Sequence, residues 1–283
     1  MSTNTSHLLN STQMAHFAAR GFLRFDELIP EDLNQEIHEL LLKRNLQGHP
    51  AGTPLSDCYP DPSPVGKMLR LPEVQGIMQS LVGPEPLFDH HAIHVREPKQ
   101  HHAQHMHGDA IIDTRMHFDV QLMYYPHDVP LEMGGTLIVP GSHFRRINES
   151  DIGRYQNFLG QMPLAGKAGT VLALHHGIWH CGRRNDTDTI RCMYKIRLNP
   201  TVRQTRLWDT SDIDDPGSSG EKAREAVGKI LRDKEPWFEN ADARLEIVNR
   251  SKFWRFLTGD DQYDTGYWLR RIENTPERLA TPA

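Results

Sequence analysis

Histidine is the residue type that stands out in this chain of 283 residues. Thirteen of the seventeen histidines fall between His90 and His180. Neutral imidazole is the commonest metal ligand in proteins. His107-Gly108-Asp109 places an imidazole and a carboxylate on one short segment, and His180 supplies a second imidazole. Two imidazoles and one carboxylate on one face of an ion leave three positions open, which is the arrangement of non-heme Fe(II) oxygenases.

A second H-x-D pattern competes with the first. His117-Phe118-Asp119 lies inside the alternating run Met116–Tyr125, which predicts a strand with both side chains on one face. We favour the first pair because it lies where a strand meets a loop, and Gly108 allows close approach to a ligand. His117 is then expected to line the interior of the fold or to face solvent. His105 is expected to support the site from a loop.

Short strands surround these residues in the sequence. Strands are predicted at Leu87–Val95, Met116–Tyr125, Thr136–Val139, Gly169–Leu174 and Ile190–Leu198. Short strands joined by Gly/Pro turns predict an antiparallel sandwich or barrel rather than alternating β-α-β units. The chain contains no G-x-G-x-x-G, G-x-x-x-x-G-K-[ST] or G-x-S-x-G motif, so the sequence offers no support for nucleotide binding or serine hydrolysis.

The N-terminal third combines a short strand with helices. Gly21–Phe25 alternates like a strand, and a helix is predicted to begin near Pro30 with acidic residues in its first turn. Residues 46–66 are rich in Gly, Pro, Asp and Ser and are predicted to form a long loop. A short helix is expected at about Leu71–Leu81.

The last part of the chain has a different character. Asp212–Gly220 has the composition of a flexible linker, and Glu221–Lys234 and Ala243–Leu257 have helical periodicity. Four of the five tryptophans lie in this part, and aromatic residues at that density are usually buried. We therefore divide the chain into a domain of residues 1–200 and a helical C-terminal extension, residues 201–283, that packs on it. A lid or a homodimer contact is the alternative role for the extension.

The composition excludes several classes of protein. With 37% hydrophobic and 24% charged residues, the chain is globular rather than fibrous or disordered. Its formal net charge of −5 argues against binding nucleic acid by phosphate neutralisation. Three scattered cysteines do not form a disulfide framework. The first residues lack the pattern of a secretory signal, and no apolar run could span a membrane. We therefore expect a soluble, cytoplasmic protein.

Four stretches of the chain resemble the phytanoyl-CoA dioxygenase family of Fe(II)/2-oxoglutarate-dependent oxygenases. They are HFAARGFLRFDELIPEDL, HMHGD, MGGTLIVPGSH and AGTVLALHHGIWHCGRRNDTDTIR, and together they span about residues 15–200. The spacing from Asp109 to Gly141 is similar to that of the family and favours His107 over His117. The resemblance implies a mainly β protein with flanking helices, built on a double-stranded β-helix (jelly-roll, cupin-like) barrel with a helical C-terminal extension.

The resemblance also implies roles for individual residues. His107, Asp109 and His180 match the iron ligands of the family. Arg191, eleven residues after His180, matches the arginine that binds the C5 carboxylate of 2-oxoglutarate. A planar guanidinium binds a carboxylate through two hydrogen bonds, which an ammonium does not.

Further contacts to the co-substrate are expected on the preceding strand. Residues 90, 92, 94 and 96 share one face of this strand by period two, and His94 and then Arg96 are the candidates. Arg96-Glu97-Pro98 replaces the Lys-Pro that the family often has near this place. Three other arginines compete with Arg191 and are otherwise expected to face solvent. They are Arg183, Arg184 and Arg197.

The implied activity is the oxidation of a C–H bond in a small organic metabolite, in the simplest case a hydroxylation. Fe(II), 2-oxoglutarate and O2 would be required, and succinate and CO2 released. Because Asp109 is present where halogenating relatives have Gly, hydroxylation is favoured over halogenation. Two alternatives stay open. One is a cupin-like metalloenzyme that does not use 2-oxoglutarate, and the other is a jelly-roll ligand-binding module without catalysis.

Overall fold

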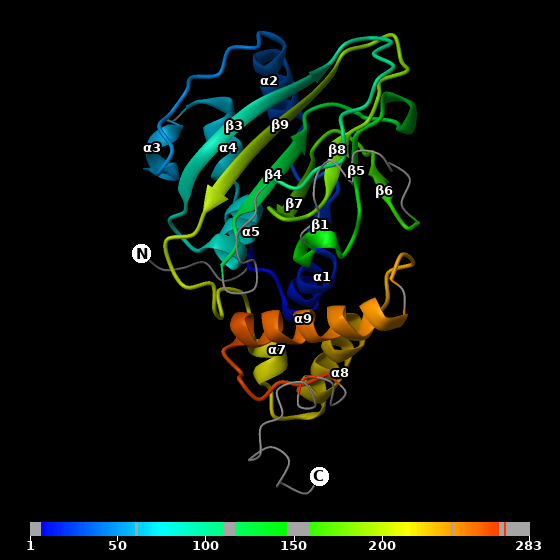
Figure 1. Cartoon of the computed structure of the whole chain (residues 1–283). Coiled ribbons are helices and arrows are strands. Elements are labelled where there is room, and N and C mark those ends of the chain that lie inside the picture. The colour runs from blue at the N-terminus through cyan, green and yellow to red at the C-terminus, as the bar shows by residue number, and fades with distance from the viewer. Residues whose placement is uncertain are drawn as a thin grey trace, which may run out of the picture.

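Two antiparallel β-sheets face each other in the computed structural model, which describes residues 7–59, 62–109, 117–145, 159–238, 240–265 and 269 (Figure 1). The strands are β1 Phe22–Phe25, β2 Thr53–Pro54, β3 Leu87–Arg96, β4 Val120–Tyr125, β5 Thr136–Ile138, β6 Met162–Leu164, β7 Thr170–His175, β8 His180–Gly182 and β9 Arg191–Asn199. Within the described residues, the large sheet has the order β1-β7-β4-β9-β3-β2 and the small sheet the order β6-β5-β8. The expected antiparallel, mainly β architecture is confirmed.

Alternate side chains of the central strands point to opposite faces of the large sheet. On one face, Met123 of β4 and Met193 of β9 pack with Ile138 and Leu164 of the small sheet. On the other face, residues such as Ile196 pack against the helices. The two hydrophobic cores therefore assign the odd-numbered residues of β9 to the space between the sheets.

The helices cover the outer face and one end of the large sheet (Figure 1). They are α1 Ser11–Arg20, α2 Glu31–Leu42, α3 Leu55–Cys58, α4 Pro64–Leu69, α5 Pro72–Val82, α7 Ser211–Asp214, α8 Ser218–Arg232 and α9 Asn240–Thr258, with 3-10 turns at Leu131–Met133 and Ser142–Phe144. Helices α2 to α5 lie on the side of the large sheet away from the small sheet, and α8 and α9 contact α1 at one end.

Local sequence explains how α1 passes into β1. Asn10 and Gln13 form a reciprocal capping box at the start of α1. Gly21 ends the helix with a φ of 78°, a conformation that glycine adopts without strain. A Cβ on Gly21 would lie 2.6 Å from Nδ1 of His143, so the turn also needs glycine for space.

Two segments that we expected to be irregular contain helices. The predicted loop of residues 46–66 holds β2, α3 and the start of α4, where the Ser63 side chain accepts a hydrogen bond from the backbone N–H of Gly66. The linker predicted at Asp212–Gly220 is also wrong, because α7 and the first turn of α8 lie there. Asp212 receives a hydrogen bond from the Ser11 hydroxyl of α1, which fixes this segment against the N-terminal helix.

The strand predictions near the site hold with small changes of boundary. Three of them correspond to β3, β7 and β9, and Thr136–Val139 to β5. The run Met116–Tyr125 is shorter than predicted, because β4 begins only at Val120 and Met116 lies outside the described residues. Strands β6 and β8 have three residues each, which is too short for alternation to reveal them.

The C-terminal extension packs on the end of the sheets through aromatic residues. Phe253 of α9 contacts Phe118 edge-on, with ring centroids 5.3 Å apart. Trp208 and Trp254 are buried against each other, as expected, whereas Trp268 lies outside the described residues. The division near residue 200 and a role as a lid or dimer contact stay predictions. None of the described helices combines the length and apolar character needed to cross a bilayer.

Candidate active site

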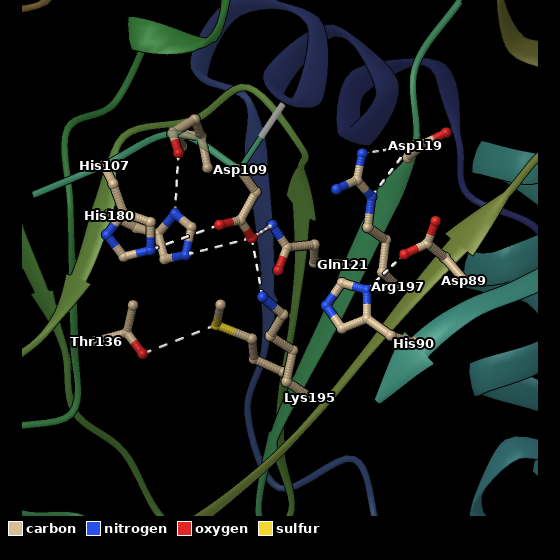
Figure 2. A network of polar contacts seen from close by, with 12 residues as sticks. Asp89, His90, His107, Asp109, Asp119, Gln121, Thr136, His180, Lys195 and Arg197 are labelled. Atoms are coloured by element: carbon tan, nitrogen blue, oxygen red, sulfur yellow. Dashed lines mark hydrogen bonds and ion pairs between the residues drawn. The ribbon is translucent and has the colours of Figure 1, made fainter. Parts of the chain in front are cut away.

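Three side chains from two distant segments converge in the space beside the small sheet (Figure 2). The segment around His107 forms an antiparallel bridge with His180 of β8, through backbone hydrogen bonds of 3.0 and 2.9 Å. Asp109 follows two residues later. Its carboxylate oxygens lie 3.5 Å from Nε2 of His107 and 3.8 Å from Nε2 of His180. The structure thus brings together all three residues that the sequence selected.

Both imidazoles are oriented by backbone carbonyl groups. Nδ1 of His107 lies 2.8 Å from the carbonyl oxygen of His105, and Nδ1 of His180 lies 3.0 Å from that of Ile178. A carbonyl oxygen only accepts, so each Nδ1 carries the proton and each Nε2 keeps a free lone pair. Burial lowers the pKa of His180 to about 4, so this ring is neutral at neutral pH. Neutral rings held in this way can bind a metal ion through Nε2.

Two further side chains that the sequence analysis did not select hold Asp109 in place. Nζ of Lys195 donates to Oδ2 of Asp109 at 2.9 Å, and the Gln121 amide donates to the same oxygen. Burial alone would raise the pKa of Asp109, but His180, once it is protonated in acid, and Lys195 outweigh burial and hold that pKa well below its ordinary value. Because both donors bind Oδ2, Oδ1 is the oxygen left for a metal ion.

Gln121→Leu tests this arrangement. The substitution removes a neutral donor without changing the charge of the site, so Asp109 can rotate. We expect Fe(II) affinity to fall by about tenfold, at the low end of what loss of a group that orients a metal ligand costs. Anaerobic Fe(II) titration measures the change, with Gln35→Leu on the exposed face of α2 as the matched control. Unchanged Fe(II) affinity in Gln121→Leu would contradict the orienting role.

The rival pair His117 and Asp119 has different surroundings. The His117 side chain is 55% exposed and its Nε2 lies 3.8 Å from Oδ1 of Asp119. Asp119 is buried and accepts hydrogen bonds of 3.0 and 2.6 Å from Nε and Nη2 of Arg197. Among the described residues, His107, Asp109 and His180 alone form a group of three that can hold a metal ion. The expectation that Arg197 faces solvent is wrong, because its side chain is only 12% exposed.

Arg191 and Arg96 lie beside each other at one end of the site. A Cβ on Gly182 would lie 3.1 Å from Nη2 of Arg96 and 3.6 Å from Nη2 of Arg191. Burial lowers the pKa of Arg191 to about 10, so its guanidinium stays charged at neutral pH. In the described part of the chain, neither arginine forms an ion pair with a carboxylate. Two neighbouring guanidinium groups without an acid suit an anionic ligand.

The segment Met133–Thr136 (MGGT) holds Arg191 in place. Nη1 of Arg191 donates to the carbonyl oxygens of Met133 and Gly135, at 2.9 and 3.1 Å. Gly134 has a φ of 101°, and a Cβ there would lie 2.2 Å from the carbonyl oxygen of Arg184. The two glycines therefore let this backbone approach the guanidinium closely. The rivals have other partners: Arg183 donates to the carbonyl oxygens of Leu131 and Gly134, and Arg184 pairs with Asp186 at the surface.

His94 of β3 lies opposite Met193 of β9, on the face of the large sheet that points toward the small sheet. Burial, with the charge of nearby Lys195, lowers the pKa of His94 to about 4. Its Nε2 is buried and has no hydrogen-bond partner among the described residues. A buried polar atom without a partner is uncommon and fits a site that a ligand completes.

A model of the family described as phytanoyl-CoA dioxygenase (PhyH) matches residues 22–193, more than half of the chain. The chain belongs to the phytanoyl-CoA dioxygenase family. The match includes His107, Asp109, His180 and Arg191. A search of curated proteins finds no match.

Several solved structures have a similar fold. HygX from Streptomyces hygroscopicus, with nickel and 2-oxoglutarate bound, is 17% identical, with 72% of this chain and 93% of that chain covered and a TM-score of 0.53. The 2-oxoglutarate-dependent carbocyclase SnoK of nogalamycin biosynthesis is 18% identical, with 71% and 87% covered and a TM-score of 0.52. AviO1 from Streptomyces viridochromogenes Tue57 is 16% identical, with 70% and 98% covered and a TM-score of 0.52. These similarities establish the jelly-roll fold of the phytanoyl-CoA dioxygenase family for this chain.

Proposed function

We propose that this protein is an Fe(II)/2-oxoglutarate-dependent dioxygenase that hydroxylates a C–H bond of a small organic metabolite and releases succinate and CO2. The observation that carries the proposal is the convergence of His107, Asp109 and His180 in a member of the phytanoyl-CoA dioxygenase family. HygX, a structural neighbour, has been solved with iron and with nickel and 2-oxoglutarate. These neighbours support iron and 2-oxoglutarate as the cofactor and co-substrate here.

The residues present fit such a centre. Two imidazole nitrogens and one carboxylate oxygen form the ligand set of non-heme Fe(II) oxygenases and leave positions for co-substrate and O2. When bound, the iron ion and 2-oxoglutarate supply the oxidising chemistry. In this proposal, His107 and His180 bind through Nε2 because the backbone holds their Nδ1 protons. Asp109 binds through Oδ1, since Gln121 and Lys195 occupy Oδ2.

Arg191 and Arg96 would hold the distant carboxylate of 2-oxoglutarate. Both guanidinium groups flank Gly182 in the space between the sheets, and neither has an acidic partner in the described structure. The buried, unpartnered Nε2 of His94 would meet the middle of the co-substrate. These residues bind and orient the co-substrate, and no side chain is required as a general base.

Hydroxylation is the reaction that we propose from among those open to this chemistry. The structural neighbours include a carbocyclase and an epimerase, so related folds support several outcomes. Asp109 completes the three-residue ligand set, so its carboxylate would take the coordination position that a halide would need. Product analysis by mass spectrometry distinguishes the outcomes, since hydroxylation adds one oxygen atom and epimerisation adds none.

Anaerobic binding of 2-oxoglutarate to the Fe(II) protein tests the proposal. Direct chelation is expected to produce a visible charge-transfer band that depends on both Fe(II) and 2-oxoglutarate. The Zn(II) protein is the control, because zinc binds the same ligands but has no redox chemistry and gives no such band. A metabolite panel screened for succinate release then identifies the substrate. Stoichiometric Fe(II) binding without a band on addition of 2-oxoglutarate would contradict the proposal.

A further inference from the structure

Strand β9 places three charged residues and one methionine on the face that lines the whole site. Arg191, Met193, Lys195 and Arg197 point into the space between the sheets, where Met193 joins the buried cluster. Lys195 contacts the metal-ligand candidate Asp109. Arg191 lies on one side of Lys195, about 13 Å away along the strand, and Arg197 lies about 7 Å away on the other side. If the co-substrate extends from the metal site to Arg191, the opposite side is left for the substrate.

We propose that Arg197 and Gln121 form a substrate subsite for a small carboxylic acid that carries a neighbouring hydroxyl or amino group. The inference rests on the proposed function, because that function assigns Arg191 to 2-oxoglutarate and leaves the Arg197 side to the substrate. Gln121 and Arg197 are direct partners in the register of β4 and β9, and Arg197 pairs in turn with His90 of β3. Figure 2 shows Gln121 between Asp109 and Arg197.

One edge of the Arg197 guanidinium is bound to a carboxylate, and the rest of the group is not. Its Nε and Nη2 both donate to Oδ2 of Asp119, at 3.0 and 2.6 Å. Within the described chain, Nη1 makes no hydrogen bond, and it is not among the fully buried polar atoms without a partner. The ion pair thus fixes the guanidinium and leaves its outer N–H groups for a ligand. A carboxylate is the group that such a fixed guanidinium binds best.

Gln121 supplies the second half of the recognition. The residue is fully buried, and its amide nitrogen is used by Asp109. Its Oε1 is buried and has no hydrogen-bond partner among the described residues. A buried acceptor left unsatisfied is costly, so a ligand that donates an O–H or N–H to it gains affinity. The nearby Arg197 then selects for a carboxylate on the same molecule.

The balance of charge favours an acidic substrate. Four cationic side chains and two carboxylates contact or flank the site between the sheets: Arg96, Arg191, Lys195 and Arg197 against Asp109 and Asp119. Asp89 lies nearer the surface, 33% exposed, and pairs with His90. A divalent ion and dianionic 2-oxoglutarate cancel each other, so positive charge remains in excess. One carboxylate on the substrate reduces this excess.

The test measures binding to the protein loaded with Fe(II) and 2-oxoglutarate under nitrogen. A panel of small amino acids and hydroxy acids is titrated by calorimetry, each acid beside its primary amide, which lacks the negative charge. We expect at least one acid to bind about tenfold or more tightly than its amide. Arg197→Gln should remove that preference and leave the affinity for 2-oxoglutarate unchanged. Arg44→Gln, which breaks an exposed pair with Glu97, is the matched control.

The outcomes separate the subsite from the proposed function. Because Arg197→Gln leaves Asp119 buried and unpaired, the double variant Arg197→Gln/Asp119→Asn repeats the test without an orphaned charge. Equal binding of every acid and its amide, or a loss of 2-oxoglutarate affinity instead of acid affinity, overturns the subsite. A wild-type charge-transfer band without acid preference overturns the subsite alone. Acid preference that depends on Arg197, in a protein without the band, supports the subsite and overturns the proposed function.

Discussion

Asp109→Ala is expected to lose tight Fe(II) binding and, with it, succinate formation. The carboxylate is the single anionic group of the ligand set, and its oxygens lie within 3.8 Å of Nε2 of both histidines. Loss of a group that only orients a ligand costs roughly 10–100-fold in metal affinity or activity, so loss of the ligand should cost more than 100-fold. Anaerobic Fe(II) titration and substrate-linked succinate release measure the two effects separately.

The variant also leaves the Lys195 ammonium without its partner in a buried position. A thermal melt must therefore accompany the assay, because an unpaired buried charge is destabilising. Asp109→Asn provides a second variant that keeps the side-chain volume and an acceptor for Lys195. His117→Ala is the matched control from the other H-x-D pattern, and its exposed side chain predicts little change. Activity that survives in Asp109→Ala but is lost in His117→Ala would show that His117 and Asp119, rather than His107 and Asp109, are the metal ligands.

The sequence identified the metal-ligand candidates because their pattern is local and their chemistry is distinctive. His107 and Asp109 are two residues apart, and His180 lies in a segment whose order resembles one family. The structure adds how they meet, through the backbone bridge between His107 and His180. It also provides the fixed Nδ1 protons, which depend on carbonyl groups that no side-chain pattern reveals.

Lys195 and Gln121 could not be found in the same way. Each is an ordinary polar residue within a strand, and only the pairing of β4 with β9 places both on Asp109. One signal was available, since three of the alternate residues of β9 that point to the interior are charged: Arg191, Lys195 and Arg197. Arg197 belongs to that series, although a charged residue is more often exposed than buried.

The errors in the fold have a common physical cause. Asp212–Gly220 has the composition of a linker, but the Ser11 hydroxyl of α1 donates a hydrogen bond to Asp212 and ties the segment to a distant part of the chain. In residues 46–66, the backbone N–H groups of Gly52 and Leu55 donate to the carbonyl oxygens of Phe88 and Pro86, outside the segment. Local composition thus predicts irregular backbone correctly only where no long-range partner fixes the segment.

Arg191→Gln is expected to raise the 2-oxoglutarate concentration needed for half-maximal charge-transfer absorbance, with little effect on Fe(II) affinity. Arg191 is buried, charged and without an acidic partner in the described chain, whereas the metal-ligand candidate Asp109 is in contact with Lys195, four residues further along β9. Breaking a buried pair costs about 3–5 kcal/mol, which corresponds to at least about a hundredfold in affinity.

Three further variants test whether Arg191 binds a carboxylate of 2-oxoglutarate through paired N–H groups. Arg191→Lys keeps the charge but not the paired N–H groups, so its affinity for 2-oxoglutarate should lie between those of wild type and Arg191→Gln. Arg96→Gln should weaken 2-oxoglutarate binding less, because carbonyl groups of the described chain hold the Arg191 guanidinium and not that of Arg96. Arg184→Gln removes an exposed ion pair with Asp186 and should leave the affinities for Fe(II) and 2-oxoglutarate unchanged. A larger effect on Fe(II) than on 2-oxoglutarate in Arg191→Gln would place this arginine at the metal centre rather than at the far end of the co-substrate.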